Sequence, residues 1–343
     1  MNTIIGLLII AVGSFGQSSS YVPIRKIKDW AWECFWLIQG IFAWLLFPYL
    51  GAIISVPEGY SLMQILSAGG LDTLKTIGFG MLWGVGGLTF GLSMRYLGVS
   101  LGQSLALGTC SAFGTLLPAL IKGTDLFEGS GLILLASVSI AVGGIAVIGY
   151  AGALKSKNMT ESERKKAVQD FALKKGILIA LLCGVMSACF SLGLEAGEPI
   201  KANALAWGTK ELLVLNPIIL LVTAGGFITN AVYCIYQNIN NKTTSQYFSV
   251  PGNVLINNLL FCALAGLLWY SQFFGLGMGR NFFEPDSVIM AFSWSILMSL
   301  NVLFSNVWGI ILKEWKGTGN KTMIVLVIGL LILIFSILFS QLF

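Results

Sequence analysis

The sequence contains no histidine, and none of its six cysteines belongs to a Cys-x-x-Cys pair. Both absences remove the usual ligand spacing of a structural or catalytic metal site. A membrane enzyme would need a nucleophile–base pair or a metal, and no acidic cluster lies inside the apolar segments. The glycine-rich stretch GVGGLTFG does not follow a strand, so it is not a nucleotide-binding loop. We therefore predict a protein that is not an enzyme, with no metal and no organic cofactor.

Charge is also scarce. Only 10% of the 343 residues are charged, whereas 56% are hydrophobic, and a soluble domain has about 25% charged residues. So few charges cannot cover that much apolar surface in water, but lipid can. The first apolar run begins MNTII, without the basic residues that open a signal peptide. We interpret it as the first membrane span.

A helix that spans the membrane needs roughly 20 mostly apolar residues. Ten segments meet this requirement, and we predict an all-α integral membrane protein with ten transmembrane helices. They lie near 2–20, 33–54, 74–94, 99–121, 130–153, 175–196, 211–237, 252–277, 286–312 and 322–342.

A charged segment, KSKNMTESERKKAVQD, follows the fifth span and divides the chain into two parts of five helices. We expect a first five-helix repeat over 1–153, a cytoplasmic linker over 154–174 and a second repeat over 175–343. Because five is odd, two similar halves would enter the membrane in opposite senses, as an inverted repeat.

One short phrase recurs at equivalent places in these halves. GMLW begins at Gly80 on the third span, and GLLW begins at Gly266, 186 residues later, on the eighth. A weaker echo joins the first and sixth spans, where GSFGQSSS from Gly13 resembles GVMSACFS from Gly184. Two echoes on equivalent helices favour a 5+5 inverted repeat, although chance matches are common in sequence rich in glycine and leucine.

The distribution of basic residues predicts the orientation. The loops after spans 1, 3, 5, 7 and 9 contain fifteen of the twenty lysine and arginine residues. Cytoplasmic loops carry the excess of these residues. We therefore expect both chain termini outside the cell.

An inverted repeat is the usual construction of secondary transporters, whose substrate site lies between the halves near the middle of the membrane. A channel is the alternative, but channels usually form from several chains around a pore or contain re-entrant filters. A single chain with two inverted halves fits alternating access better.

Four segments, SSSYVPIRKIKDWAWECFW, LWGVGGLTFGLSMRYLGVSLG, LLWYSQFFGLG and IILKEW, resemble those of the L-rhamnose–proton symporter family, a branch of the drug/metabolite transporter superfamily. The resemblance implies a multi-pass protein of the bacterial inner membrane that imports L-rhamnose or a related 6-deoxyhexose by cation symport. It implies a small neutral sugar and the lipid bilayer as partners and no nucleic acid. A monomer or a homodimer, sodium in place of the proton, and a superfamily exporter or exchanger of another small metabolite remain alternatives.

A sugar site needs amides or hydroxyls for paired hydrogen bonds and an aromatic ring for the sugar's C–H face. The eighth span is the richest segment in amide and aromatic side chains. Trp83 holds the same place in the repeated phrase on span 3 as Trp269 does on span 8. Hydrogen bonding between helices and anchoring at the membrane surface are the alternatives for these residues. The predicted substrate-binding residues are Trp269, Gln272, Asn258, Trp83, Tyr270, Gln17 and Asn257.

Uphill transport needs a group whose charge changes as the site switches sides, and a carboxylate within the membrane is a candidate. Glu195 and Glu198 are three residues apart, so they share a helical face, and two nearby carboxylates raise the proton affinity of at least one of them. The alternative is a wet helix end with Lys201 as counter-ion. Glu33 is the third candidate, and it could instead be a favourable charge at the start of span 2.

Overall fold

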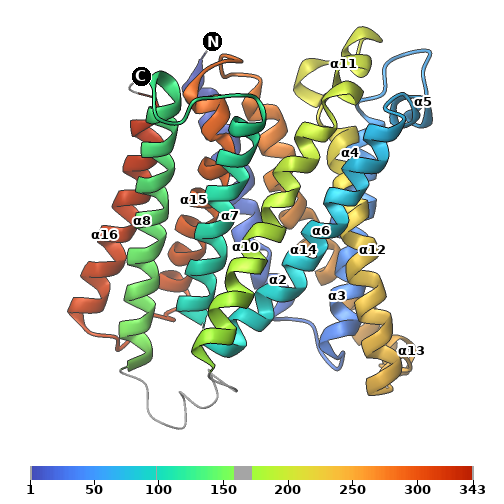
Figure 1. Cartoon of the computed structure of the whole chain (residues 1–343). Helices are drawn as coiled ribbons and strands as arrows, with labels where there is room; N and C mark the ends of the chain where they lie inside the picture. Colours follow the sequence, from blue (N-terminus) through green and yellow to red (C-terminus); the bar gives the residue numbers. More distant parts are fainter. Residues whose placement is uncertain (1, 98, 158–171, 342–343) are drawn as a thin grey trace. The chain divides into compact units, whose positions relative to one another are not determined.

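A computed structural model describes residues 2–97, 99–157 and 172–341, and within those ranges the chain is helical with no strand (Figure 1). The predicted linker over 154–174 lies mostly outside the described residues. The elements are α1 (Thr3–Ser19), α2 (Tyr21–Ile24), α3 (Trp32–Gly40), the π-helical turn η1 (Ile41–Leu46), α4 (Phe47–Ile53), α5 (Leu62–Ser67), α6 (Leu71–Leu97), α7 (Val99–Ile121), α8 (Gly129–Lys157), α10 (Leu173–Ala196), α11 (Glu198–Ala206), the 3-10 turn η2 (Glu211–Leu213), α12 (Asn216–Asn241), α13 (Gln246–Ser249), α14 (Gly252–Arg280), α15 (Val288–Ile311) and α16 (Asn320–Phe339).

The prediction of ten membrane spans is confirmed. In the described part of the chain, ten helical segments are long and apolar enough to cross a bilayer. Helices are expected here because lipid offers no hydrogen bonds, so the backbone must satisfy its own. The second span, Trp32–Ile53, differs from the expectation of one plain helix, because the turn η1 separates α3 from α4.

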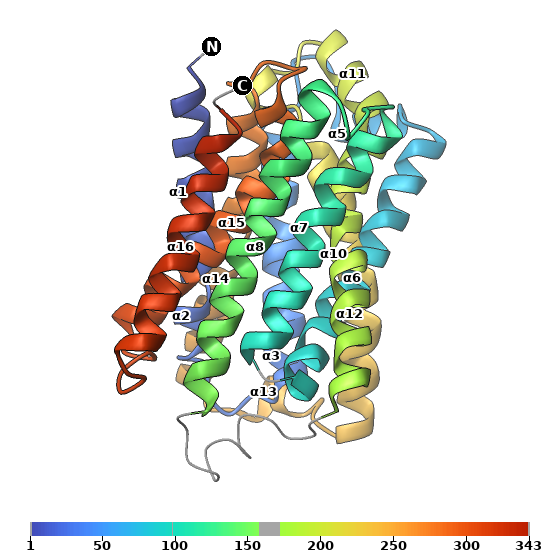
Figure 2. The ribbon, with the colours of Figure 1, turned by 60° about the vertical axis from the view of Figure 1, so that its left-hand side comes forward.

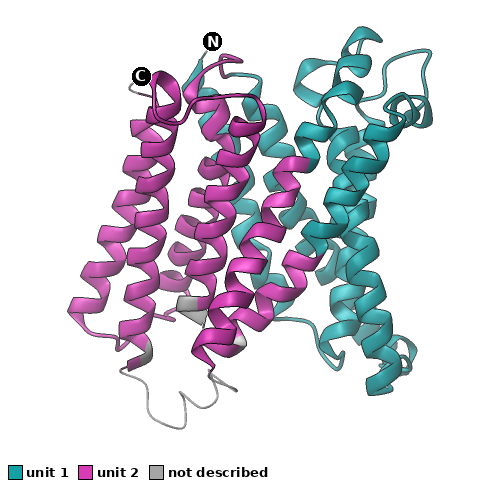
Figure 3. Cartoon of the chain, in the orientation of Figure 1, with its two compact units in different colours: residues 1–84, 193–282 teal, residues 85–192, 283–343 magenta. Residues whose placement is uncertain are grey.

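The chain forms two compact units that do not coincide with its two halves in sequence (Figure 3). Unit 1 consists of residues 1–84 and 193–282, and unit 2 of residues 85–192 and 283–343. Helices α6 and α10 contribute to both units, because the divisions fall within them. Each unit therefore contains helices from the first and the second half of the chain.

Unit 1 is built on close helix crossings at small residues. A Cβ atom at Gly13 of α1 would lie 3.2 Å from the Cα of Gln272 on α14. A Cβ atom at Gly275 of α14 would lie 3.0 Å from the carbonyl oxygen of Ile9 on α1. Residue numbers fall along α1 as they rise along α14, so the two helices are antiparallel. Glycine permits this approach because it has no side chain to separate the backbones.

The repeated phrases form a second set of crossings in unit 1. A Cβ atom at Gly80 of GMLW would collide with the backbone of Val222 on α12. A Cβ atom at Gly266 of GLLW would lie 2.7 Å from the Cβ of Phe42 and 2.9 Å from the nitrogen of Ala43, both on η1. The glycine that opens each phrase therefore marks a helix crossing, and the tryptophan follows one helical turn later.

Unit 2 packs α7, α8, α15 and α16 together, and α16 lies beside α8 (Figure 2). Its apolar core contains Ile145, Ile148, Val302, Leu326 and Leu333. Between α7 and α15 the core is polar but hydrogen-bonded. The hydroxyl of Ser295 lies 2.8 Å from the hydroxyl of Ser111 and 2.8 Å from that of Thr115. Such pairs join helices inside a membrane without leaving polar atoms unsatisfied.

Candidate functional site

The two tryptophans of the repeated phrases meet inside unit 1. The ring centroids of Trp83 on α6 and Trp269 on α14 are 5.8 Å apart, with the ring planes at 38°. A Cβ atom at Gly226 of α12 would collide with the ring of Trp83, so the ring lies directly on that glycine. Two predicted sugar-contact residues, separated by 186 positions in the chain, are therefore neighbours.

A third ring joins them, and the sequence analysis missed it. Trp44 on η1 contacts Trp83 at 6.0 Å and Trp269 at 5.8 Å between ring centroids, in both cases edge to face. Trp36 of α3 contacts Trp44 at 5.5 Å, and Phe273 contacts Trp269 at 5.2 Å. We call Trp44, Trp83 and Trp269 the tryptophan cluster. The π-helical turn that directs Trp44 has no signature in hydrophobic periodicity, so the available signal was only the abundance of tryptophan on span 2.

Buried amides lie on α14, which carries Trp269, and on α12, whose Gly226 packs against the ring of Trp83. Gln272 is 4% exposed and donates from Nε2 to the carbonyl of Trp269 at 3.1 Å. Asn230 of α12 accepts the indole N–H of Trp36 at 3.0 Å and donates to the carbonyl of Gly226 at 2.8 Å. Aromatic faces beside amide groups are the chemistry that a sugar site requires. The sequence analysis named Gln272 and overlooked Asn230.

Tyr270 points to a different neighbour from Trp269. Its side chain is buried, and its hydroxyl donates to the Oδ1 of Asn216 at 3.4 Å. A Cβ atom at Gly51 of α4 would collide with that hydroxyl. Tyr270 therefore packs α14 against α4, and its predicted contact with the sugar stays a prediction.

Asn258 holds a loop in place. It is fully buried, its Nδ2 donates to the carbonyl of Lys28 at 2.7 Å, and its Oδ1 accepts the Lys28 backbone N–H at 3.1 Å. Eleven residues of helix put it about 16 Å along α14 from Trp269. Both polar groups of its amide are engaged by backbone, although the predicted sugar contact itself is untested.

The two other predicted sugar contacts are only half-buried. Asn257 lies near the start of α14, and Gln17 lies near the end of α1, where its Oε1 accepts from the hydroxyl of Ser18 at 3.3 Å. The ring contacts that define the tryptophan cluster involve neither residue. Their role in binding also stays a prediction.

Glu33 is 5% exposed and lies in the first turn of α3. Its Oε1 accepts from the Nδ2 of Asn241 at 3.0 Å and from the hydroxyl of Thr243 at 2.7 Å. These neutral donors come from the end of α12 and the loop after it, so the carboxylate joins span 2 to span 7. A carboxylate at a helix N-terminus is also favoured by the helix dipole.

The same helix ends contain a polar network next to Glu33. The thiol of Cys34 donates to the Oδ1 of Asn238 at 3.2 Å, and the Nδ2 of Asn238 donates to the hydroxyl of Tyr247 at 2.9 Å. Burial raises the pKa of Tyr247 to about 12, so its phenol stays protonated at physiological pH. Tyr247 therefore serves this network as a neutral group.

The other two coupling candidates lie where α10 passes into α11. Glu195 is half-buried near the end of α10, and Glu198 opens α11. The ammonium of Lys201 lies 3.1 Å from each carboxylate oxygen of Glu198, and this pair is partly exposed. The counter-ion considered in the sequence analysis is thus present for Glu198.

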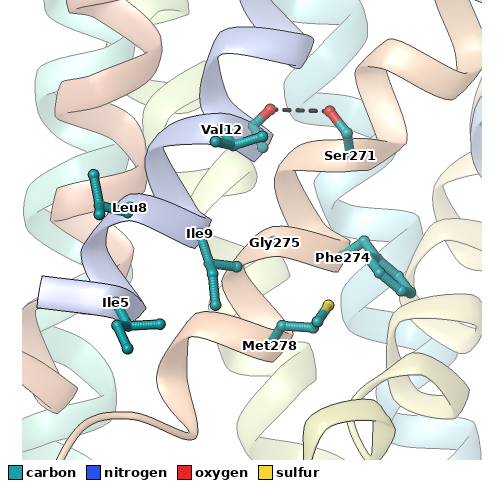
Figure 4. A pocket seen from close by; sticks show the side chains of 9 residues that line it. Ile5, Leu8, Ile9, Val12, Ser271, Phe274, Gly275 and Met278 are labelled. Carbon is teal, nitrogen blue, oxygen red and sulfur yellow. Dashed lines mark hydrogen bonds between the residues drawn. The ribbon is translucent and has the colours of Figure 1, made fainter. Parts of the chain in front are cut away.

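A groove of about 390 Å³ lies between α1 and α14, and its chemistry differs from that of the tryptophan cluster (Figure 4). Ile9, Val12, Phe274 and Met278 are among its apolar lining. The Ser271 hydroxyl at its edge donates to the carbonyl of Gly13 at 3.0 Å. The groove offers apolar contact but few polar groups for sugar hydroxyls, so we place the candidate sugar site at the tryptophan cluster.

A model of the L-rhamnose-proton symport protein family matches residues 1–342. The chain belongs to this family. L-rhamnose-proton symporters of Yersinia pestis (strain Pestoides F) and Yersinia pseudotuberculosis (serotypes O:1b and O:3) are each 35% identical to it over 338 residues. The match covers 97% of this chain and 96% of each relative. The sequence-based resemblance to L-rhamnose-proton symporters is thus confirmed at the level of the family. The matching relatives are named as transporters.

Proposed function

We propose that the protein imports L-rhamnose or a related 6-deoxyhexose together with a proton, by alternating access in the bacterial inner membrane. One structural observation carries the proposal, which is the meeting of Trp83, Trp269 and Trp44, with the buried amide of Gln272 one helical turn after Trp269 on α14. Indole faces suit the C–H face of a sugar, including the methyl group of a 6-deoxyhexose, and the amide suits its hydroxyls. The names of the Yersinia relatives supply the substrate and the coupling ion.

The proposal includes a 5+5 inverted repeat within the drug/metabolite transporter superfamily, with halves at 1–153 and 175–343. Paired contacts support the repeat. Gly80 on the third span packs on α12, the seventh span, and Gly266 on the eighth span packs on η1, in the second. Spans 3 and 8 are five apart in the order of spans, and so are spans 2 and 7. The crossing of spans 3 and 7 therefore corresponds to the crossing of spans 8 and 2 in the other half.

The second echo gives a matching pair. Gly16 of α1 packs against Ser271 of α14, and Ser187 of α10 packs against Gly86 of α6. The first echo has a spacing of 186 residues, which relates Ser271 to position 85, one residue from Gly86. The second echo has a spacing of 171 residues, which relates Gly16 to Ser187. The crossing of spans 1 and 8 is thus repeated, within one residue, by the crossing of spans 6 and 3.

We propose Glu195 and Glu198 as the proton-coupling pair, with Glu33 as the other candidate. Lys201 forms an ion pair with Glu198, and this pair would separate during the transport cycle. Glu33 is held by two neutral donors, which also stabilise its charged form. The family's name favours the proton over sodium as the coupling ion.

Uptake of labelled L-rhamnose into proteoliposomes tests the function. We expect accumulation when a proton gradient is imposed and only equilibration without it. Accumulation driven by a sodium gradient, or uptake that no 6-deoxyhexose inhibits, would contradict the proposal. Reporter fusions should place both chain termini outside, and termini on opposite sides would contradict the topology.

Coupling is tested separately from binding. Glu195→Gln combined with Glu198→Gln should leave sugar exchange intact and stop gradient-driven accumulation. Glu33→Gln is the matched comparison at the other carboxylate. Normal accumulation in the double variant, with loss in Glu33→Gln, would transfer the coupling role to Glu33.

A further inference from the structure

Trp44 lies at the centre of the tryptophan cluster and is 5% exposed. Its ring meets those of Trp36, Trp83 and Trp269 edge to face, with interplanar angles of 74°, 85° and 77°. Trp83 and Trp269 occupy equivalent places in the repeated phrases. Trp44 has no counterpart of its own kind on α12, where the glycines Gly225 and Gly226 lie against α6 instead.

The indole nitrogen of Trp44 is buried and has no hydrogen-bond partner among the described residues. Three other indoles are bonded. Trp36 donates to Asn230 at 3.0 Å, Trp30 to the carbonyl of Gln246 at 2.9 Å, and Trp294 to that of Cys110 at 3.3 Å. An unsatisfied buried donor costs about 1–3 kcal/mol, and native proteins contain few of them.

Two local features hold the indole in this position. Trp44 lies within the π-helical turn η1, and π-helical turns in α-helices occur often at functional sites. A Cβ atom at Gly40, one turn earlier, would lie 2.8 Å from the ring carbons of Trp44. The missing side chain at Gly40 therefore gives the ring its place against the helix. The backbone thus positions a donor that has no hydrogen-bond partner among the described residues.

We propose that Trp44 is a specificity-determining residue, whose indole N–H donates to a hydroxyl of the sugar that binds against Trp83 and Trp269. This inference rests on the proposed function and adds to it the donor that reads one hydroxyl position. The centroids of Trp83 and Trp269, 5.8 Å apart, leave no room for a pyranose between them. The sugar must therefore part these rings on entry, and the hydroxyl then satisfies the Trp44 donor.

The proposal predicts how binding depends on the sugar. Purified full-length protein is titrated with L-rhamnose and with the 2-deoxy, 3-deoxy and 4-deoxy forms of L-rhamnose, and binding is followed by calorimetry. Wild-type protein should bind one of the three about tenfold more weakly because that analogue lacks the hydroxyl paired with Trp44. Trp44→Phe should bind L-rhamnose about tenfold more weakly and lose that discrimination, so that its affinities for L-rhamnose and for the analogue become equal.

Trp36→Phe is the matched control, because its indole N–H already has a partner in Asn230. It should lower the melting temperature and keep the wild-type discrimination among the deoxy sugars. Trp44→Phe removes an unsatisfied donor but also trims a buried ring, so its melting temperature should fall less than that of Trp36→Phe. If it does not fold, benzothienylalanine at position 44 gives a ring of indole shape that lacks the N–H.

The outcomes separate the inference from the proposed function. If wild-type protein binds L-rhamnose and Trp44→Phe or the benzothienyl variant keeps the full discrimination, the indole N–H does not read the sugar and the inference is wrong. The indole N–H of Trp44 would then only contact the aromatic faces of the neighbouring rings. If wild-type protein binds no 6-deoxyhexose, the proposed function fails, and the inference fails with it.

Discussion

Unit 1 keeps indole rings and side-chain amides in its interior, whereas unit 2 keeps aliphatic side chains and hydroxyls. Seven of the ten tryptophans belong to unit 1. Among the described residues, six buried asparagine and glutamine side chains belong to unit 1 and one to unit 2. In unit 1 these amides are Gln39, Asn216, Asn230, Asn238, Asn258 and Gln272.

Several hydroxyls of unit 2 bond to carbonyls of their own helices, although the buried hydroxyl of Ser299 has no partner among the described residues. Ser137 donates to the carbonyl of Ile133 at 2.8 Å, and Ser336 donates to that of Leu333 at 2.7 Å. A hydroxyl can use its own helix in this way, whereas an amide has two donors and an acceptor to place. In unit 1 some of these atoms remain unpaired, including the Oε1 of Gln39 and the Nδ2 of Asn216.

This difference suggests a division of labour between the units. Unsatisfied polar atoms destabilise a buried interior, so a protein that keeps them has a use for them in some state. The buried amides and indole rings of unit 1 agree with the proposal that the sugar binds there, although unit 2 also contains a buried hydroxyl without a partner, that of Ser299.

The largest effect is expected from truncation of the sugar contacts in unit 1. Trp269→Ala and Gln272→Ala should each abolish L-rhamnose uptake, a loss of about 30-fold or more, since each removes a buried contact of hot-spot size. Uptake is measured in proteoliposomes, normalised to inserted protein.

Trp294→Phe in unit 2 is the control for that loss. It removes the bond to the carbonyl of Cys110 and trims a packed ring, so it should lower the melting temperature while uptake per folded protein persists. Normal uptake in both unit 1 variants would remove span 8 from the sugar site. Loss of uptake in Trp294→Phe alone would reverse the assignment of the two units.

A smaller effect is expected at the crossings that position the tryptophan cluster. Gly80→Ala and Gly266→Ala each place a methyl group against a neighbouring helix, which should cost about 1–3 kcal/mol of stability. Thermal unfolding of the purified protein measures this cost.

Gly78→Ala provides the comparison on α6, because a Cβ atom there meets nothing within 4 Å. It should leave stability unchanged or raise it by up to about 1 kcal/mol, since alanine favours the helix. Equal melting temperatures for Gly78→Ala and Gly80→Ala would show that the crossing at the repeated phrase is not tight.

The smallest effect is expected in the hydroxyl cluster of unit 2. Ser295→Ala removes the partner of Ser111 and Thr115, but both can turn to carbonyls of their own helix. Interhelical hydrogen bonds in membranes average about 0.6 kcal/mol, so the melting temperature should fall slightly and uptake should not change. A loss of uptake in this variant would make the hydroxyl cluster part of the transport path.

Hydrophobic runs predicted the ten spans well because a bilayer imposes one length on every spanning helix. The predicted segment 252–277 is α14, Gly252–Arg280, and 286–312 is α15, Val288–Ile311. The break in span 2 was not predicted, because the residues of η1 are as apolar as those around them. A π-helical turn depends on how the helix packs rather than on its composition.

The candidate site was predicted in part for a similar reason. The recurring phrase identified Trp83 through Trp269, because GMLW and GLLW end in the same residue. Trp44 and Asn230 have no such echo, so only their neighbours in the folded protein identify them. Asn258 shares a helical face with Trp269 in projection, but the projection ignores distance along the axis. Its amide binds the backbone of Lys28, and its predicted sugar contact stays a prediction.

The sequence by itself determined that the helices lie in lipid, how many of them span the membrane, the family, and the pair of tryptophans in the repeated phrases, Trp83 and Trp269. These properties follow from composition, from the length that a bilayer imposes on a spanning helix, and from a repeated sequence phrase. All of them can be assessed without knowing which residues meet in the folded protein. Only the tertiary structure decided which buried polar groups are left without partners and which third ring contacts both Trp83 and Trp269. Hydrogen bonds and ring contacts form between helices, so whether a donor is satisfied depends on residues that are far away in the chain.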